Sequence, residues 1–343
     1  MKSAILAFLL LNLASLLYTP AAIAAGPSNL VTITPLGTQN GEFCRDDRAL
    51  LFEDPTGVRI LTAPGRTVQG SGDPRIAPLG FVHVVLIDHP HTDHIGDVLR
   101  TNCAGTTTVA LAFPTQGNAP EIAARHNSAV LVGGEMASFF TQKIQNILGA
   151  APAACPAAGL NNEMNVPRTS PCVATIRGGT RTVAFAGMPG VKITTIPAFH
   201  GAGAPPALID SPGVPAGLTG YMGSEGGYII RFTNGLTVLW TGDSGLIGDW
   251  ATQSDFYKPN LAVVHMDGLN VMGPEEAAYA VNKLIKPRTV IPEHANEVST
   301  SGGKVNPGTH VEQFMHLVTE AKVIVPLSGM KITCDGQGNC RRR

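Results

Sequence analysis

Four apolar segments, far apart in the chain, each end on a histidine or an aspartate. The first, FVHVVLID, runs into HPHTDHIGD at residues 89–97, where three histidines and an aspartate fall within six positions. His200 closes ITTIPAFH, Asp243 closes LTVLWTGD and His294 closes RTVIPEH. Apolar runs bounded by Gly, Pro and polar turns indicate strands, and sites are usually built on the loops that leave a rigid sheet. We therefore expect these strand ends to supply one site.

The residue types in this set are those that bind metal ions. Imidazole and carboxylate groups suit zinc and related ions; one ion takes about four ligands and a pair takes more. Any one of these residues alone would more often be a core or turn residue, whereas their joint placement at strand ends predicts a metal centre. The candidate ligands are His89, His91, Asp93, His94, His200, Asp243 and His294.

The chain between these strands alternates strand-like and helix-like segments without an internal repeat. Helical periodicity covers PEIAARHN, GEMASFFTQKIQNIL, GPEEAAYAVNKLIK and THVEQFMHLVTEA, and Asn234-Gly235 predicts a hairpin. Strand groups followed by alternating strands and helices predict a layered α/β domain with its helices outside. No linker divides it. Residues 149–180, rich in Ala, Pro and Asn and without a clear period, are expected to form a surface insertion.

The histidine-rich run has a recognisable spacing. H-x-H-x-D-H resembles the signature of the metallo-β-lactamase superfamily, and GGYIIRFTNGLTVLWTGDSGL, NVMGPEEAAYAV and KPRTVIPEH resemble the branch of metal-dependent hydrolases that includes the ascorbate-6-phosphate lactonase. The resemblance covers about residues 30–327. It implies a four-layer αβ/βα sandwich, the metallo-β-lactamase fold, with a dinuclear site at one edge. It implies a first ion on His89, His91 and His200, a second on Asp93, His94 and His294, and Asp243 as the bridge.

Such a centre implies an enzyme, a dinuclear metal-dependent hydrolase. A hydroxide that bridges the two ions would attack a carbonyl or phosphoryl centre, and Asp93, besides binding metal, would hold that hydroxide and move its proton. We expect cleavage of a lactone, ester or amide-type bond in a small, mostly uncharged molecule. β-Lactam hydrolysis and phosphodiester hydrolysis remain alternatives, and so does metal binding without catalysis.

Other residues bear on the substrate and the metal. The Gly- and Pro-rich segment from Gly201 to Gly227 is expected to border the site, and its lack of a basic residue disfavours a phosphate ester; Lys304 offers the one nearby cation. His265 and Asp267, at a further strand end, are expected to touch substrate or support a ligand. The ligand types favour two Zn²⁺ ions, and Mn²⁺ or iron also fits.

The ends and the cysteines predict the compartment. Residues 1–25 have the layout of a secretory signal peptide, with a retained membrane anchor as the alternative, and residues 26–343 form the hydrolase domain. We therefore expect a periplasmic or secreted protein with no membrane contact after cleavage. The net charge of −1 indicates no nucleic-acid partner; the oligomeric state stays open. Six cysteines in an oxidising compartment predict disulfides. The expected pairs are Cys155–Cys172, Cys334–Cys340 and, by remainder, Cys44–Cys103.

Overall fold

Two large mixed β-sheets carry the chain. The computed structural model describes residues 29–70, 73, 81–204 and 219–343. The expected signal peptide and residues 205–218 of the Gly201–Gly227 segment lie outside this part. The first sheet has the order β23 (Cys340–Arg342), β22 (Ile332–Cys334), β1 (Val31–Pro35), β2 (Leu50–Glu53), β3 (Arg59–Thr62), β4 (Val84–Ile87), β7 (Ala129–Val132), β10 (Cys172–Thr175) and β8 (Ala153–Ala154).

The second sheet faces the first and holds most of the remaining strands. Its order is β21 (Lys322–Val323), β18 (Thr289–Glu293), β17 (Leu261–His265), β16 (Thr237–Trp240), β15 (Gly226–Arg231), β12 (Val191–Pro197), β11 (Thr180–Phe185) and β9 (Glu163–Val166). Three short ribbons lie outside both sheets: β5 (Leu99–Arg100) with β6 (Thr108–Val109), β13 (Gly203–Ala204) with β14 (Gly220–Tyr221), and β19 (Thr300–Ser301) with β20 (Lys304–Val305).

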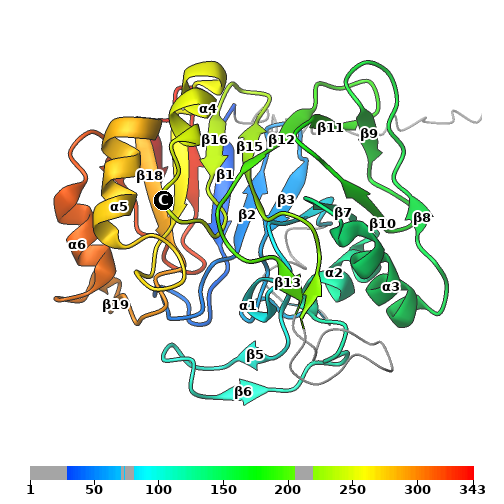
Figure 1. Cartoon of the computed structure of the whole chain (residues 1–343), viewed down its shortest axis with the longest axis horizontal. Coiled ribbons are helices and arrows are strands. Elements are labelled where there is room, and N and C mark those ends of the chain that lie inside the picture. Colours follow the sequence, from blue (N-terminus) through cyan, green and yellow to red (C-terminus); the bar gives the residue numbers. More distant parts are fainter. Residues whose placement is uncertain (1–28, 71–72, 74–80, 205–218) are drawn as a thin grey trace, which may run out of the picture.

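Helices cover the outer face of each sheet, as Figure 1 shows with α5 and α6 on one side and α2 and α3 on the other. The helices are α1 (Thr92–Ile95), α2 (Asn118–His126), α3 (Met136–Leu148), α4 (Asp249–Tyr257), α5 (Pro274–Tyr279), which continues as a π-helical turn (Ala280–Ile285), and α6 (His310–Leu317). All four segments with helical periodicity are helical. Within the described residues, no helix is both long enough and apolar enough to cross a bilayer.

The core explains why the sheets stack. Along β4, Val84 and Leu86 pack into the cluster between the two sheets, whereas Val85 and Ile87 pack into the cluster under α2 and α3. Both faces of this strand are therefore buried, which is why its sequence is apolar at every position. A third cluster, which includes the buried Trp250, joins the outer face of the second sheet to α4, α5 and α6. Three apolar layers between four structural layers confirm the αβ/βα sandwich.

The segment 149–180 differs from the expected surface insertion. It supplies β8 and β10 to the edge of the first sheet and β9 to the edge of the second. β10 pairs in parallel with β7, and Cys172 and Ala174 face the central core. The sequence signal is weak because these strands are short and are interrupted by Pro and Asn, which disfavour strands. The predicted disulfide between Cys155 and Cys172 is present, and so are Cys334–Cys340 and Cys44–Cys103.

Candidate metal centre

The ligand-bearing strands all deliver their ends to the same place. β16, β17 and β18 run parallel, and β12 runs with them because both β12 and β16 are antiparallel to β15. His200, Asp243 and His294 follow the carboxyl ends of β12, β16 and β18, and HPHTDH follows the carboxyl end of β4 in the facing sheet. The seven candidate ligands therefore meet at one edge of the sandwich, as the sequence predicts.

Three histidines form the first of two ligand groups. His89, His91 and His200, hereafter the histidine group, have one ring nitrogen each within 4.8 Å of the others. Their ring centroids lie 4.3 to 5.1 Å apart. Burial lowers the pKa of His91 to about 4, helped by the neighbouring His89 and His200, and burial also lowers the pKa of His200. His91 and His200 are therefore neutral at pH 7, the form that binds a metal ion.

Asp93, His94, Asp243 and His294 form the second group, hereafter the acid group, again within 4.8 Å of one another. α1 is a single helical turn that presents Asp93 and His94 side by side. The Asp243 Oδ2 atom lies 3.3 Å from His94 Nε2 and 3.2 Å from His294 Nε2, and Asp93 Oδ2 lies 3.2 Å from His294 Nε2. Tetrahedral ligands at bond lengths of about 2.0–2.1 Å are separated by about 3.3–3.4 Å, so this group has the spacing of a metal site.

One carboxylate oxygen joins the two groups. Asp243 Oδ2 lies 3.7 Å from His89 Nε2 and 3.6 Å from His200 Nε2, besides its contacts in the acid group. The Nε2 atoms of His89 and His94 are buried and make no hydrogen bond in the described part of the chain. Buried polar atoms of native proteins have partners as a rule. The donor set and these unpaired nitrogens therefore fit bound metal ions.

Asp88, which follows β4, fixes several of these groups from behind. Its Oδ1 lies 2.8 Å from His94 Nδ1, and its Oδ2 accepts a hydrogen bond of 3.0 Å from the backbone N–H of Asp243. Burial opposes its ionisation, but His94 and His89 outweigh burial and hold the pKa of Asp88 well below its usual value. A carboxylate on the far ring nitrogen of a histidine sets the tautomer and the ring orientation. Asp88 thus orients the Nε2 atom of His94 toward the site.

His265 and Asp267 support the ligands rather than face the solvent. His265 Nδ1 lies 2.7 Å from Asp243 Oδ1, and its Nε2 lies 3.1 Å from the buried carboxylate of Glu293. Burial disfavours the charge on His265, yet Asp243 and Glu293 outweigh it and raise its pKa to about 9. Asp267 Oδ2 accepts a hydrogen bond of 2.6 Å from Asn296 and lies 3.9 Å from His294 Nδ1. Of the two expected roles, the geometry favours ligand support for His265.

Arg48 is a site residue that sequence reasoning misses. Its guanidinium is 1% exposed, donates from Nη1 to Asp93 Oδ2 and donates from Nη2 to Asn296 Oδ1 at 2.9 Å. It holds the pKa of Asp93 well below its usual value, outweighing the opposing effect of burial together with the site histidines. A lone arginine before a short strand carries no recognisable signal, because arginines are usually exposed. Only the folded chain brings it to Asp93.

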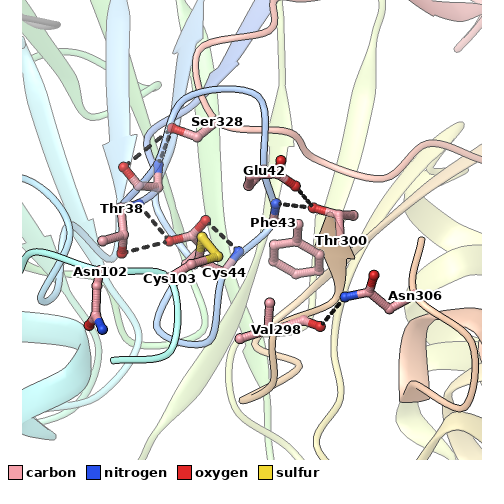
Figure 2. Close-up of a disulfide and its surroundings, with 12 residues drawn as sticks. Thr38, Glu42, Phe43, Cys44, Asn102, Cys103, Val298, Thr300, Asn306 and Ser328 are labelled. Carbon is pink, nitrogen blue, oxygen red and sulfur yellow. Dashed lines mark hydrogen bonds between the residues drawn. A yellow bond between two sulfur atoms is a disulfide. The ribbon is translucent and has the colours of Figure 1, made fainter. Parts of the chain in front are cut away.

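The loop that carries Arg48 is fastened on two sides, as Figure 2 shows. The disulfide Cys44–Cys103 ties it to the ribbon β5–β6, which projects beside α1 in Figure 1. On the other side, the backbone N–H of Phe43 donates to Thr300 Oγ1 at 2.8 Å, and that hydroxyl donates to Glu42 at 2.6 Å. Arg48 therefore meets Asp93 from a braced segment.

Comparisons with known proteins agree with this geometry. The family model described as Beta-lactamase superfamily domain matches residues 46–294, which include all seven candidate ligands. The chain belongs to the metallo-β-lactamase superfamily. The superfamily's signature here is His89, His91, Asp93 and His94, so the resemblance drawn from the sequence is confirmed at the level of the superfamily.

Two relatives and one solved structure are similar to this chain over most of its length. A UPF0173 metal-dependent hydrolase of Cupriavidus taiwanensis is 28% identical over 319 residues, 91% of this chain and 93% of the relative. A second, from Cupriavidus necator, is 29% identical over 81% of this chain and 80% of the relative. The metallo hydrolase Igni18 of Ignicoccus hospitalis has the same fold, with a TM-score of 0.53 and 21% identity over 89% of this chain and 99% of that one. The protein is a metal-dependent hydrolase of this superfamily.

Proposed function

We propose that the protein is an exported dinuclear hydrolase that cleaves a lactone, ester or amide-type bond in a small, mostly uncharged molecule. The observation that carries the proposal is the position of Asp243 Oδ2, between 3.2 and 3.7 Å from a ligand nitrogen of His89, His94, His200 and His294. When two divalent ions are bound there, they lower the pKa of water and polarise the oxygen of the scissile carbonyl. The ligand types favour Zn²⁺, with Mn²⁺ or iron as alternatives.

The protein's own side chains hold the water molecule and move its proton. Water adds across the acyl bond, so its oxygen ends on the acyl carbon and one proton reaches the leaving oxygen. Asp93 is the acid-group carboxylate within reach of solvent, with 24% of its side chain exposed, whereas the Asp243 side chain is 2% exposed. Arg48 keeps Asp93 ionised. An ionised, partly exposed carboxylate can hold a water molecule by a hydrogen bond and pass its proton on, and we assign that role to Asp93.

Export is part of the proposal. The six cysteines form three disulfides in the structure. Disulfides persist in oxidising compartments and are rare in the cytosol. Together with the signal-peptide layout of residues 1–25, they support a periplasmic or secreted protein. Sequencing the N-terminus of protein recovered from the periplasm tests this, because cleavage near Ala24 leaves a chain that begins close to residue 25, and a chain beginning at Met1 would contradict it.

The chemistry is tested on purified mature protein by metal content and initial rates. The substrates are one γ-lactone, one aryl ester, one β-lactam and one phosphodiester, with Asp243→Asn as the disabled variant. We expect two equivalents of metal per chain and turnover of the lactone and the ester. Preferred turnover of the β-lactam or the phosphodiester would replace the proposed substrate class, and full metal loading without turnover of any substrate would support metal binding without catalysis.

A further inference from the structure

Three large apolar side chains stay exposed around one hollow beside the metal centre. The hollow measures about 500 Å³, and His200 of the histidine group forms part of its wall. Phe199, Leu246 and Leu269 line it and are 73%, 42% and 88% exposed. Single exposed apolar residues are ordinary, but several gathered at one concave place mark a binding surface. The volume is in the range of small-molecule sites, about 300–1,000 Å³.

Hydrogen bonds of the backbone hold Phe199 at this place. Its N–H donates to Ser244 Oγ at 3.0 Å, and its carbonyl accepts from the N–H of Gly245 at 2.9 Å. A Cβ atom on Gly245 would come within 3.3 Å of the Phe199 ring, so the ring lies directly over that glycine. Ser244 and Gly245 directly follow the ligand Asp243. The apolar wall and the metal ligand are therefore parts of one fixed segment.

Leu269 is presented by an equally constrained turn. Asp267 Oδ1 accepts backbone hydrogen bonds from Leu269 at 2.8 Å, Asn270 at 2.7 Å and Val271 at 3.1 Å. The other oxygen of Asp267 binds the Asn270 amide at 2.6 Å, besides the Asn296 amide beside Arg48. These four bonds fix the backbone of the turn that presents Leu269, whose side chain is 88% exposed. Its exposed surface is preformed, which lowers the entropic cost of binding a ligand.

The charges around the hollow exclude one ligand class. Among its described lining residues there is neither a lysine nor an arginine, and Glu276 at its rim is an exposed acid. An anionic group would find no cationic partner there and would meet the Glu276 carboxylate. An uncharged apolar group would instead cover the exposed surfaces of Phe199, Leu246 and Leu269 at no electrostatic cost.

We propose that this hollow binds the apolar chain of the substrate while the metal centre cleaves its polar head, which makes the substrate class alkyl-substituted lactones or esters. The inference rests on the proposed function. Its occupant is a small molecule because the hollow shares His200 with the ligand set, so whatever fills it lies against the reacting bond. Leu269 and Phe199 would then decide specificity through the chain length that they can cover.

The test is a series of γ-lactones whose alkyl side chain grows from one carbon to seven. We expect kcat/KM of the wild-type enzyme to rise about two- to threefold with each added methylene until the hollow is filled, less than the fourfold of full burial. Leu269→Ser and Phe199→Ser should flatten this rise. The matched controls are Leu160→Ser and Phe256→Ser. These side chains are 102% and 75% exposed and do not line the hollow, so both variants should keep the rise of kcat/KM with chain length. A flat series in the wild type, or flattening in the controls alike, would overturn the proposal.

Binding without chemistry separates this inference from the proposed function. The 3-alkylcyclopentanones replace the ring oxygen of the lactone by a methylene, so they cannot be hydrolysed. Calorimetry on the metal-loaded enzyme should show affinity that rises with chain length in the wild type and not in Leu269→Ser. If ketone affinity rises with chain length but no lactone is turned over, the apolar binding site is supported and the proposed reaction is wrong. If lactones are turned over but ketone affinity does not depend on chain length, the proposed reaction is supported and the apolar binding site is wrong. Sedimentation that shows a dimer dissociated by Leu269→Ser would identify a second copy as the occupant and overturn the proposal.

Discussion

The histidine group offers a metal ion three imidazoles, whereas the acid group offers two carboxylates with two histidines. The two groups also differ in the charged residues that contact them. The carboxylates of the acid group are fixed by other charged groups: Arg48 binds Asp93, and His265 binds Asp243. His91 makes no comparable side-chain contact among the described residues, and the side chain of His200 is 12% exposed. Buried carboxylates need hydrogen-bonded counter-charges, and both carboxylates of the acid group have them. In the histidine group the supporting residue is Asp88, whose Oδ2 lies 3.1 Å from His89 Nδ1.

The largest effect is expected where the two groups meet. Asp243→Ala removes the carboxylate oxygen that lies near the Nε2 atoms of both groups. We therefore expect both ions to be lost and hydrolysis to fall at least about a thousandfold, equivalent to about 4 kcal/mol of transition-state stabilisation. Metal analysis and initial rates measure this. Asp255→Ala, which changes an exposed aspartate paired with Lys258, is the matched control and should retain both metal and rate. Asp243→Asn keeps the test available if the alanine variant does not fold. Turnover within tenfold of wild type would contradict a bridging role.

Variants confined to one group should separate the two positions. His91→Ala removes a ligand from the histidine group and Asp93→Ala one from the acid group, so each should lower the metal content from two equivalents to one while hydrolysis falls about a hundredfold or more. Absorption spectra of the cobalt-substituted variants show which position remains occupied, because the two ligand sets differ. Identical spectra for the two variants, or loss of both ions in each, would mean that the groups are not independent positions.

The supporting contacts predict a difference in stability as well. Arg48→Met leaves the mostly buried Asp93 carboxylate without its counter-charge, and we expect the metal-free protein to lose about 2–4 kcal/mol of unfolding free energy. His91→Ala should cost less than about 1 kcal/mol, since a half-buried ring is removed without leaving a charge unpaired. Urea unfolding measures both. Arg59→Met breaks the partly exposed pair with Glu53 and is the control, expected to cost about 0–1 kcal/mol. Equal losses for all three would remove the contrast between the groups.

A smaller effect, on the pH dependence of stability, is expected from His83, a histidine outside both groups. Burial lowers the pKa of His83 to about 4, and its Nδ1 accepts the backbone N–H of Arg59 at 3.0 Å. Because the folded pKa lies below the unfolded value of 6.5, the unfolded chain takes up the proton first as pH falls. Its contribution is present above pH 6.5 and is lost toward pH 4.

Unfolding of the metal-free protein at pH 7 and pH 4.5 measures that loss. We expect His83→Gln to reduce the difference in unfolding free energy between the two pH values by about 1–2 kcal/mol. His316→Gln, which replaces an exposed histidine on α6, is the control and should leave the difference unchanged. An unchanged difference in His83→Gln would show that folding does not lower the pKa of His83.

The seven candidate ligands could be selected from the sequence because each follows an apolar strand, and the carboxyl ends of these strands lie at one edge of the sandwich. His265 could be predicted as a supporting residue for the same reason, because it ends the strand β17. Arg48, Asp88 and Glu293 were not, because a buried charged residue differs from an exposed one only through its partners, and these come from distant parts of the chain. The strands of residues 149–180 were missed because they are short and their pairing with β7 and β11 is set by the core, not by local preference.

The most direct test of the dinuclear centre is anomalous diffraction from crystals of the zinc-loaded protein, recorded on both sides of the zinc absorption edge. We expect two peaks about 3.5–4 Å apart, one beside His89, His91 and His200 and the other beside Asp93, His94 and His294, with Asp243 between them. A single peak at full zinc occupancy, or two peaks that do not share Asp243, would contradict it.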